Sequence, residues 1–262
     1  MLMVLIMLFI FKYSLLFFGE LFYILKFYKY SLHCYQLVYD NDPNDLECLE
    51  KMISCCGYLG NYDLVIKYSN RYLEIDENNF NVYYYNAQAL FIFEKYDDAL
   101  KYYDMALNID PDNIFGLMGK ADVLFKLGES NLFLECSQKI LSRNPHNFHI
   151  LYKISNLYFK KNELDLALNY VNDCLDIENK NFHALFLKSK ILAKQNLFGD
   201  SLHVLNTLIY YYPKNIDALF FKTLVLMDMG EFFEAKRCVD YILKLDGNFE
   251  DALEIKHILE KH

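Results

Sequence analysis

The chain has 262 residues, of which 54% are hydrophobic, and its formal net charge is −9. Its lysine and arginine residues form no run, which argues against nucleic acid as a partner, because phosphates are bound largely through clustered basic side chains. We expect instead a protein partner that is neutral or basic rather than acidic.

The first 25 residues allow two interpretations. Residues 1–11 form an uncharged apolar run, which Lys12 interrupts. In the first interpretation, residues 1–25 are a membrane anchor, and Lys26 and Lys29 hold the following chain on the cytoplasmic side. In the second, Lys12 opens the first of a series of repeats. A charge near the middle of a membrane span is costly, which favours the second interpretation.

A fixed period of 34 residues runs through the chain. The four prolines, Pro43, Pro111, Pro145 and Pro213, are separated by 68, 34 and 68 residues, all multiples of 34. Such a period indicates a stacked array of repeats. Steps of 34 from residue 12 define seven repeats, which are 12–45, 46–79, 80–113, 114–147, 148–181, 182–215 and 216–249. Residues 250–262 remain as a C-terminal helix that would cap the array.

Equivalent positions of the repeats carry residues of the same kind. In residues 80–113 the pattern predicts two amphipathic helices, joined by a turn at residues 94–96 and ended at residues 110–111. The eighth and twentieth positions are mostly small, as Ala87 and Ala99 are here, and would let helices approach closely. The fifteenth is Gly or Asn in five of the seven repeats. These residues accept the left-handed conformation that ends a helix, so the position predicts the turn.

These positions resemble the tetratricopeptide repeat. The family's pattern appears in the third repeat at Tyr83, Asn86, Ala87, Leu90, Ala99, Tyr103 and Pro111. Departures are the absence of tryptophan and the polar Asn86 at a leucine position. The resemblance implies an all-α fold, a right-handed superhelical solenoid of about seven helix-turn-helix repeats with a C-terminal capping helix.

The resemblance also implies that positions two, five, nine and twelve of each first helix line a concave groove that binds a partner. Rings beside amides at these positions suit an extended peptide or a helix. The groove residues are Asn81, Tyr84, Gln88 and Phe91, then Phe115, Met118, Asp122 and Phe125, then His149, Tyr152, Asn156 and Phe159, and finally His183, Phe186 and Lys190. Alternatively, these rings fill the groove by packing on one another. The fifth position holds no lysine in any repeat, so we expect no clamp for carboxylate tails.

No catalytic or cofactor-binding motif appears in the sequence. His146 and His149 form an H-x-x-H pair without suitable further ligands, so we expect no metal site. The seven cysteines lack C-x-x-C spacing, which indicates reduced, buried thiols rather than disulfides. We therefore expect neither an enzyme nor a cofactor.

The sequence thus predicts a non-enzymatic, cytoplasmic scaffold whose groove binds a peptide or helix of another protein. The alternative is a membrane-tethered assembly or recruitment factor anchored by residues 1–25. Binding of RNA by helical repeats is disfavoured by the acidic balance of the chain.

Overall fold

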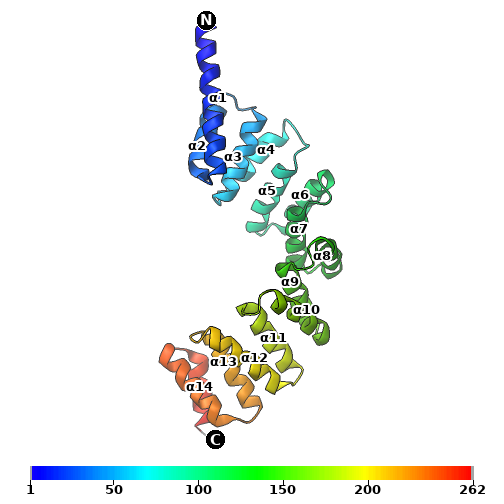
Figure 1. The fold of residues 1–262 in the computed structure, drawn as a ribbon, viewed down its shortest axis with the longest axis vertical. Helices are drawn as coiled ribbons and strands as arrows, with labels where there is room; N and C mark the ends of the chain where they lie inside the picture. Colours follow the sequence, from blue (N-terminus) through cyan, green and yellow to red (C-terminus); the bar gives the residue numbers. More distant parts are fainter. Residues whose placement is uncertain (1, 261–262) are drawn as a thin grey trace. The chain divides into compact units, whose positions relative to one another are not determined.

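The computed structural model describes residues 2–260, with side chains from residue 10 onward, and contains only helices over that range (Figure 1). The fifteen helices of these residues are α1 (Leu2–Ile24), α2 (Tyr28–Tyr39), α3 (Leu46–Tyr58), α4 (Tyr62–Leu73), α5 (Phe80–Ile92), α6 (Tyr96–Ile109), α7 (Ile114–Leu127), α8 (Ser130–Arg143), α9 (Phe148–Lys160), α10 (Leu164–Ile177), α11 (Phe182–Lys194), α12 (Phe198–Tyr211), α13 (Ile216–Asp228), α14 (Phe232–Leu245) and α15 (Glu250–Leu259). The predicted all-α fold of consecutive helix-turn-helix pairs is confirmed.

Two compact lobes make up the chain. The N-terminal lobe comprises residues 1–140 and the C-terminal lobe residues 141–262, so the division falls within α8. In the N-terminal lobe, side chains such as Leu49 and Tyr72 are buried between α2, α3, α4 and α5. In the C-terminal lobe, Val171 and Ile191 belong to one buried cluster and Val239 to another. Each lobe therefore has apolar clusters of its own.

The turn inside each helix pair has a left-handed residue at the position that the sequence predicts. All seven residues at this position have φ between 58° and 79°, namely Lys26, Gly60, Glu94, Gly128, Asn162, Asn196 and Gly230. Lys26 and Glu94 adopt this conformation although their side chains disfavour it. The geometry of the turn is thus kept even where the residue type does not favour it.

Most first helices begin with a side-chain cap. The side-chain oxygen of an Asn or Asp residue accepts a hydrogen bond from a backbone N–H in the first turn. This bond satisfies one of the unpaired amides there. The capping residues are Asp45 for α3, Asn79 for α5, Asn113 for α7, Asn147 for α9, Asn181 for α11 and Asn215 for α13. A polar residue just before each of these helices therefore sets its first residue.

The two helices of a pair meet at the small residues that the sequence indicates. Ala87 and Ala99 are both fully buried. In the first pair, the Ser31 hydroxyl donates to the Gly19 carbonyl at 2.8 Å, which joins the two positions directly. Two further pairs have the same bond. The Ser155 hydroxyl donates to the Ala167 carbonyl and the Ser201 hydroxyl to the Ser189 carbonyl, each at 2.8 Å. Side chains of this size let backbone and hydroxyl come into contact across the helix pair.

Helix α1 is longer than the other first helices, and it runs without a break through residue 12. Figure 1 shows its N-terminal half extending past the end of α2. The Lys12 ammonium lies 2.6 Å from the Asp45 carboxylate and 3.3 Å from Asp42, in the loop that leads to α3. These ion pairs and the Ser31–Gly19 bond place residues 12–24 in the first helix pair. Among residues 10–260, whose side chains the structure describes, no helix combines the length and apolarity needed to cross a bilayer.

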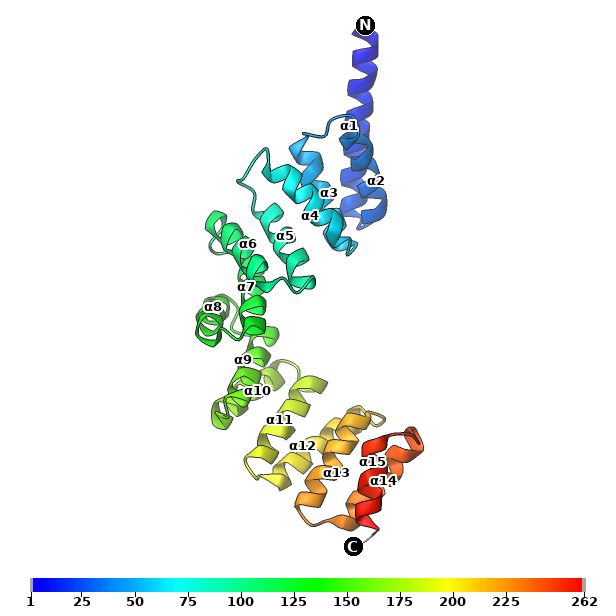
Figure 2. The ribbon, with the colours of Figure 1, turned by 180° about the vertical axis from the view of Figure 1, so that it is seen from behind.

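At the other end, α15 packs against α14 (Figure 2). Its buried side chains are Ala252, Ile255 and Leu259. Leu253, next to the buried Ala252, is 45% exposed, because successive residues of a helix point about 100° apart. The helix covers the apolar end of the C-terminal lobe as predicted, although the last two residues of the chain lie outside the described range.

Candidate functional site

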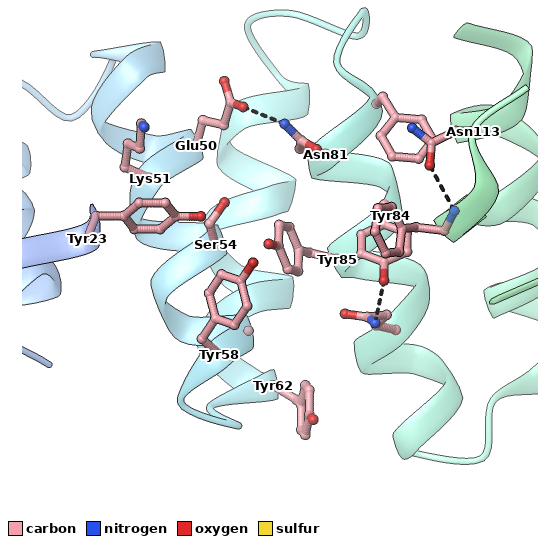
Figure 3. A pocket seen from close by; sticks show the side chains of 14 residues that line it. Tyr23, Glu50, Lys51, Ser54, Tyr58, Tyr62, Asn81, Tyr84, Tyr85 and Asn113 are labelled. Atoms are coloured by element: carbon pink, nitrogen blue, oxygen red, sulfur yellow. Dashed lines mark hydrogen bonds between the residues drawn. The ribbon is translucent and has the colours of Figure 1, made fainter. Parts of the chain in front are cut away.

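A cavity of about 770 Å³ opens in the N-terminal lobe beside α3 and α5. Figure 3 shows the rings of Tyr23, Tyr58 and Tyr85 gathered around Ser54, with Tyr84 on the far side of Tyr85. We call it the tyrosine cavity. Its lining is completed by Glu50, Lys51, Gly57, Tyr62, Phe80, Asn81, Gln88, Asn113 and Phe115.

A second cavity of about 320 Å³ adjoins the first. The two share Tyr62, Tyr84, Gln88 and Phe115. The smaller cavity extends along α5 and α7, where its lining includes Phe91, Met118, Asp122 and Tyr103. The two cavities together therefore form one trough over three first helices, α3, α5 and α7.

Of the predicted groove residues in this lobe, most line the trough. These are Asn81, Tyr84, Gln88, Phe91, Phe115, Met118 and Asp122. Phe125 packs edge-on against the buried ring of Phe133, with ring centroids 5.3 Å apart. Residues at this helical spacing therefore line the trough on α5 and on most of α7, whereas Phe125 near the end of α7 packs against another ring.

Hydrogen bonds hold several polar groups of the trough in place. The Glu50 carboxylate accepts from the Asn81 amide at 2.8 Å and from the Asn79 amide at 3.0 Å. The Gln88 amide donates to the Tyr84 hydroxyl at 2.8 Å. Each of these groups keeps further donor or acceptor capacity, since an amide and a hydroxyl both have more than one bonding site. The trough can therefore bond to a peptide backbone while retaining its own geometry.

Three tyrosine hydroxyls of the cavity, those of Tyr23, Tyr84 and Tyr85, stay protonated at neutral pH. Burial, followed by the charge of the neighbouring Tyr58 phenol, raises the pKa of Tyr23 to about 12. Burial is also the largest cause that raises the pKa of Tyr84 and of Tyr85. Neutral phenols can both donate and accept hydrogen bonds, and their rings present apolar faces.

A missing side chain on α3 creates the place for Tyr85. A methyl group built at Gly57 would lie 2.7 Å from Tyr85 Cδ1, closer than real side chains approach. The ring therefore lies directly over the α3 backbone. From there it contacts Tyr58 and Tyr84, with ring centroids 6.2 Å and 5.4 Å away.

Lys51 is held at the wall of the cavity by two contacts. Its ammonium lies 2.7 Å from the Glu20 carboxylate and 4.8 Å from the centroid of the Tyr23 ring. The hydrogen bond from Lys51 lowers the pKa of Glu20, so this carboxyl is ionised at neutral pH. The lysine charge is thus balanced within the protein.

Sequence reasoning did not single out the α3 side of the trough. Glu50, Ser54 and Gly57 occupy the fifth, ninth and twelfth positions of the second repeat, and Tyr23 the twelfth of the first. The positional rule applied to these two repeats would have found them. Tyr85 occupies the sixth position and had no such signal, because its place depends on Gly57 of another helix.

In the C-terminal lobe the predicted groove residues lie close to other rings and cations. The Tyr152 ring stacks on Phe148 at 6.2 Å and meets His183 edge-on at 6.3 Å. The Lys190 ammonium lies 4.1 Å from the Phe186 ring centroid, and the Lys194 ammonium 5.0 Å from that of Phe159. Asn156 is half-buried and His149 is exposed. These contacts match the alternative in which the rings pack on one another.

The cysteines are suited to packing rather than to chemistry. All seven are free thiols in this structure, and all except the half-buried Cys238 are buried. Burial raises the pKa of Cys48 and of Cys174 to about 12, far from the range in which a thiolate forms at neutral pH. Within the described residues, no group of three or more His, Cys, Asp or Glu side chains is placed to hold a metal ion.

Comparisons with known proteins agree with the helix-pair architecture. A family model described as tetratricopeptide repeat matches residues 148–181, the bounds of the fifth predicted repeat. No curated protein matches the sequence.

Several solved structures share the fold. The C-terminal part of a TPR repeat-containing protein from Cytophaga hutchinsonii is 15% identical, with a TM-score of 0.75 over 91% of this chain and 98% of that one. A tetratricopeptide repeat protein from Parabacteroides merdae is 11% identical, with a TM-score of 0.66 over 95% and 99%. YrrB, described as a TPR protein with an unusual peptide-binding site, is 18% identical, with a TM-score of 0.59 over 72% and 97%.

At these identities the solved structures are evidence for the fold alone. Residues 148–181 thus match the tetratricopeptide-repeat family. The left-handed turn at the same position of every described helix pair and the shared fold extend the resemblance to the other pairs.

Proposed function

We propose that the protein is a non-enzymatic interaction scaffold whose N-terminal lobe binds a segment of a partner protein. The observation that carries the proposal is the trough formed by the two adjoining cavities over α3, α5 and α7. Tetratricopeptide-repeat proteins with this fold include YrrB, which is described as having a peptide-binding site. The peptide-binding site of YrrB supports a peptide as the kind of partner. The side chains of this chain support the trough as the binding site.

The chemistry of the trough suits a peptide in two ways. Rings such as Tyr84 and Phe115 offer contact area at low entropy cost, since each has only two rotatable bonds. Amides such as Asn81 and Gln88 can bond to a peptide backbone. This mixture of rings and amides is typical of surfaces that bind protein segments.

The test uses a peptide library displayed on phage and selected against the full chain. We expect enriched peptides to lose affinity about tenfold on Phe115→Ala, which removes a central contact of the trough. Phe115 is 64% exposed, so its loss should leave the fold intact. Phe233→Ala is the matched control, because Phe233 is 71% exposed on α14, outside the trough.

Two results would overturn the proposal. One is the absence of enriched peptides in repeated selections. The other is equal affinity of the selected peptides for the Phe115→Ala and Phe233→Ala variants.

The exposed rings of α1 support a second candidate, recruitment to a membrane surface. Phe17 is 65% exposed, and Ile10, Phe11 and Phe18 beside it are also exposed. Apolar rings on a helix surface can enter the interface of a bilayer without crossing it. We propose a peripheral contact through this face of α1.

Flotation of the full chain with vesicles of phosphatidylcholine and phosphatidylserine tests this candidate. The unchanged protein should float with the vesicles, and Phe17→Glu should abolish flotation while Phe233→Glu does not. Failure of the unchanged protein to float, or flotation of Phe17→Glu, would remove the candidate.

A further inference from the structure

Negative charge exceeds positive charge around the tyrosine cavity. The donors to the Glu50 carboxylate are the neutral amides of Asn79 and Asn81, so they orient this charge without neutralising it. No basic side chain in the described part of the chain forms an ion pair with Glu50. The lysine in the cavity lining, Lys51, is already balanced by Glu20 at 2.7 Å. One unbalanced carboxylate therefore remains at the rim.

The wall of the cavity already binds one cation. The Lys51 ammonium lies 4.8 Å from the centroid of the Tyr23 ring, within the ~6 Å over which a ring attracts a cation. The Tyr58 ring follows Tyr23 at a centroid distance of 6.1 Å, and Tyr85 follows Tyr58 at 6.2 Å. The aromatic surface thus continues from the position that Lys51 occupies into the open cavity.

We propose that the open part of the tyrosine cavity, lined by Tyr58, Tyr84 and Tyr85 with Glu50 at its rim, binds a cationic side chain of the partner segment. This inference rests on the proposed function and adds to it the charge of one partner residue. The ring faces attract the arginine or lysine head group, and Glu50 supplies the opposite charge. The net charge of −9 draws basic segments toward the chain over longer distances.

An acidic side chain suits the same position poorly. It would lie near the Glu50 carboxylate, whose like charge repels it. The ammonium that could attract it belongs to Lys51, and Glu20 already holds that group. The phenols can donate hydrogen bonds to an anion, so they do not by themselves exclude an acidic side chain. The preference for a cationic side chain therefore depends on the carboxylates of Glu50 and Glu20.

The test compares two small probes of nearly equal shape. N-acetylarginine amide carries a guanidinium group, and N-acetylcitrulline amide replaces it with a neutral urea group. We titrate each into the full chain labelled with carbon-13 in its tyrosine rings, and assign the signals with Tyr58→Phe and Tyr85→Phe. The arginine probe should shift the signals of both residues in a saturable way, and the citrulline probe should not.

Charge substitutions separate the role of Glu50 from general electrostatics. Glu50→Gln keeps an acceptor oxygen but loses the charge, and should weaken binding of the arginine probe about threefold to tenfold. Glu47→Gln is the matched control, because Glu47 lies on the same helix and is exposed outside the cavity. Equal shifts with both probes, or equal weakening by both substitutions, would overturn the inference. Stronger shifts with N-acetylglutamate amide would do the same.

The outcomes keep this inference apart from the proposed function. Selected peptides that bind the trough without a basic residue, and whose affinity Glu50→Gln leaves unchanged, would retain the scaffold and remove the cation position. A saturable arginine response without any selected peptide would support the cation position and remove the peptide function.

Discussion

At the residue scale, the tyrosine content of the chain is explained in part by the glycines it packs against. In each case a ring occupies the space that a glycine on a neighbouring helix leaves empty. A methyl group at the glycine would lie within 3 Å of the ring at Gly19 with Tyr35, Gly57 with Tyr85 and Gly119 with Tyr103. The glycines are therefore packing residues here, as the alanines are at other helix contacts.

Gly119→Ala tests this pairing. The added methyl group would lie 2.3 Å from the Tyr103 ring, which is only 2% exposed. We expect a loss of about 1–3 kcal/mol in the free energy of unfolding. Gly199→Ala is the control, because nothing lies within 4 Å of the added group and alanine is the better helix former. Chemical denaturation of both variants measures the difference, and equal changes would contradict the pairing.

Ala99→Leu tests the close contact inside a helix pair. Ala99 is fully buried, so the larger side chain should cost about 1–3 kcal/mol through overpacking between α5 and α6. Lys101→Ala on the outer face should be nearly neutral, because its ion pair with Asp98 is mostly exposed to water. Thermal denaturation compares the two variants. Similar shifts in Tm would show that Ala99 does not lie at the helix contact.

At the element scale, Asp45 combines two roles that stabilise the start of α3. Its side chain caps the helix by accepting from the Cys48 backbone N–H, and it pairs with Lys12 of α1 at 2.6 Å. Burial by itself would raise the pKa of Asp45. The hydrogen bonds from Lys12 and from the Cys48 N–H outweigh burial and hold this pKa below its ordinary value. The carboxylate therefore ties α1 to the next helix pair while it caps α3.

Asp45→Asn should keep the cap and lose the ion pair, since asparagine caps helices as well as aspartate does. A carboxyl with a lowered pKa in the folded state adds stability above its unfolded pKa of about 3.9, and that stability is lost as the pH falls through the folded value. We therefore expect the variant to lose less stability between pH 7 and pH 3 than the unchanged protein. Urea denaturation at the two pH values measures this, and an unchanged difference would contradict it.

At the scale of the whole molecule, most contacts between helices join neighbours in the chain. Within each lobe, helices that follow one another in the chain pack together, and the two lobes have their own buried clusters. In arrays of this kind a local change in stability spreads mainly to adjacent repeats. The two ends of the chain should therefore respond separately to mutation.

Hydrogen exchange read by mass spectrometry tests this independence. Ala99→Leu should increase exchange in α5, α6 and the adjacent helices, and leave α13 and α14 unchanged. Ala235→Leu, at the equivalent buried position of the last pair, should do the reverse. Increased exchange over the whole chain from either variant would show that the protein unfolds as one cooperative unit.

The sequence by itself determined the helix pairs, their turns and the faces on which they meet. These features depend on local preferences: Asn113 caps a helix by bonding to its own first turn, Gly128 accepts a left-handed turn, and Ala99 is small. Because the same preferences recur every 34 residues, their periodicity is visible without coordinates.

Only the tertiary structure decided which inner side chains face an open cavity. Tyr84 lines the trough, whereas Tyr152, at the same position two repeats later, stacks on Phe148 and meets His183. The rule for groove positions specifies the side of a helix, but the space on that side depends on neighbouring helices. Gly57 on α3 makes room for Tyr85 on α5, and this contact joins residues with no local relation in the sequence.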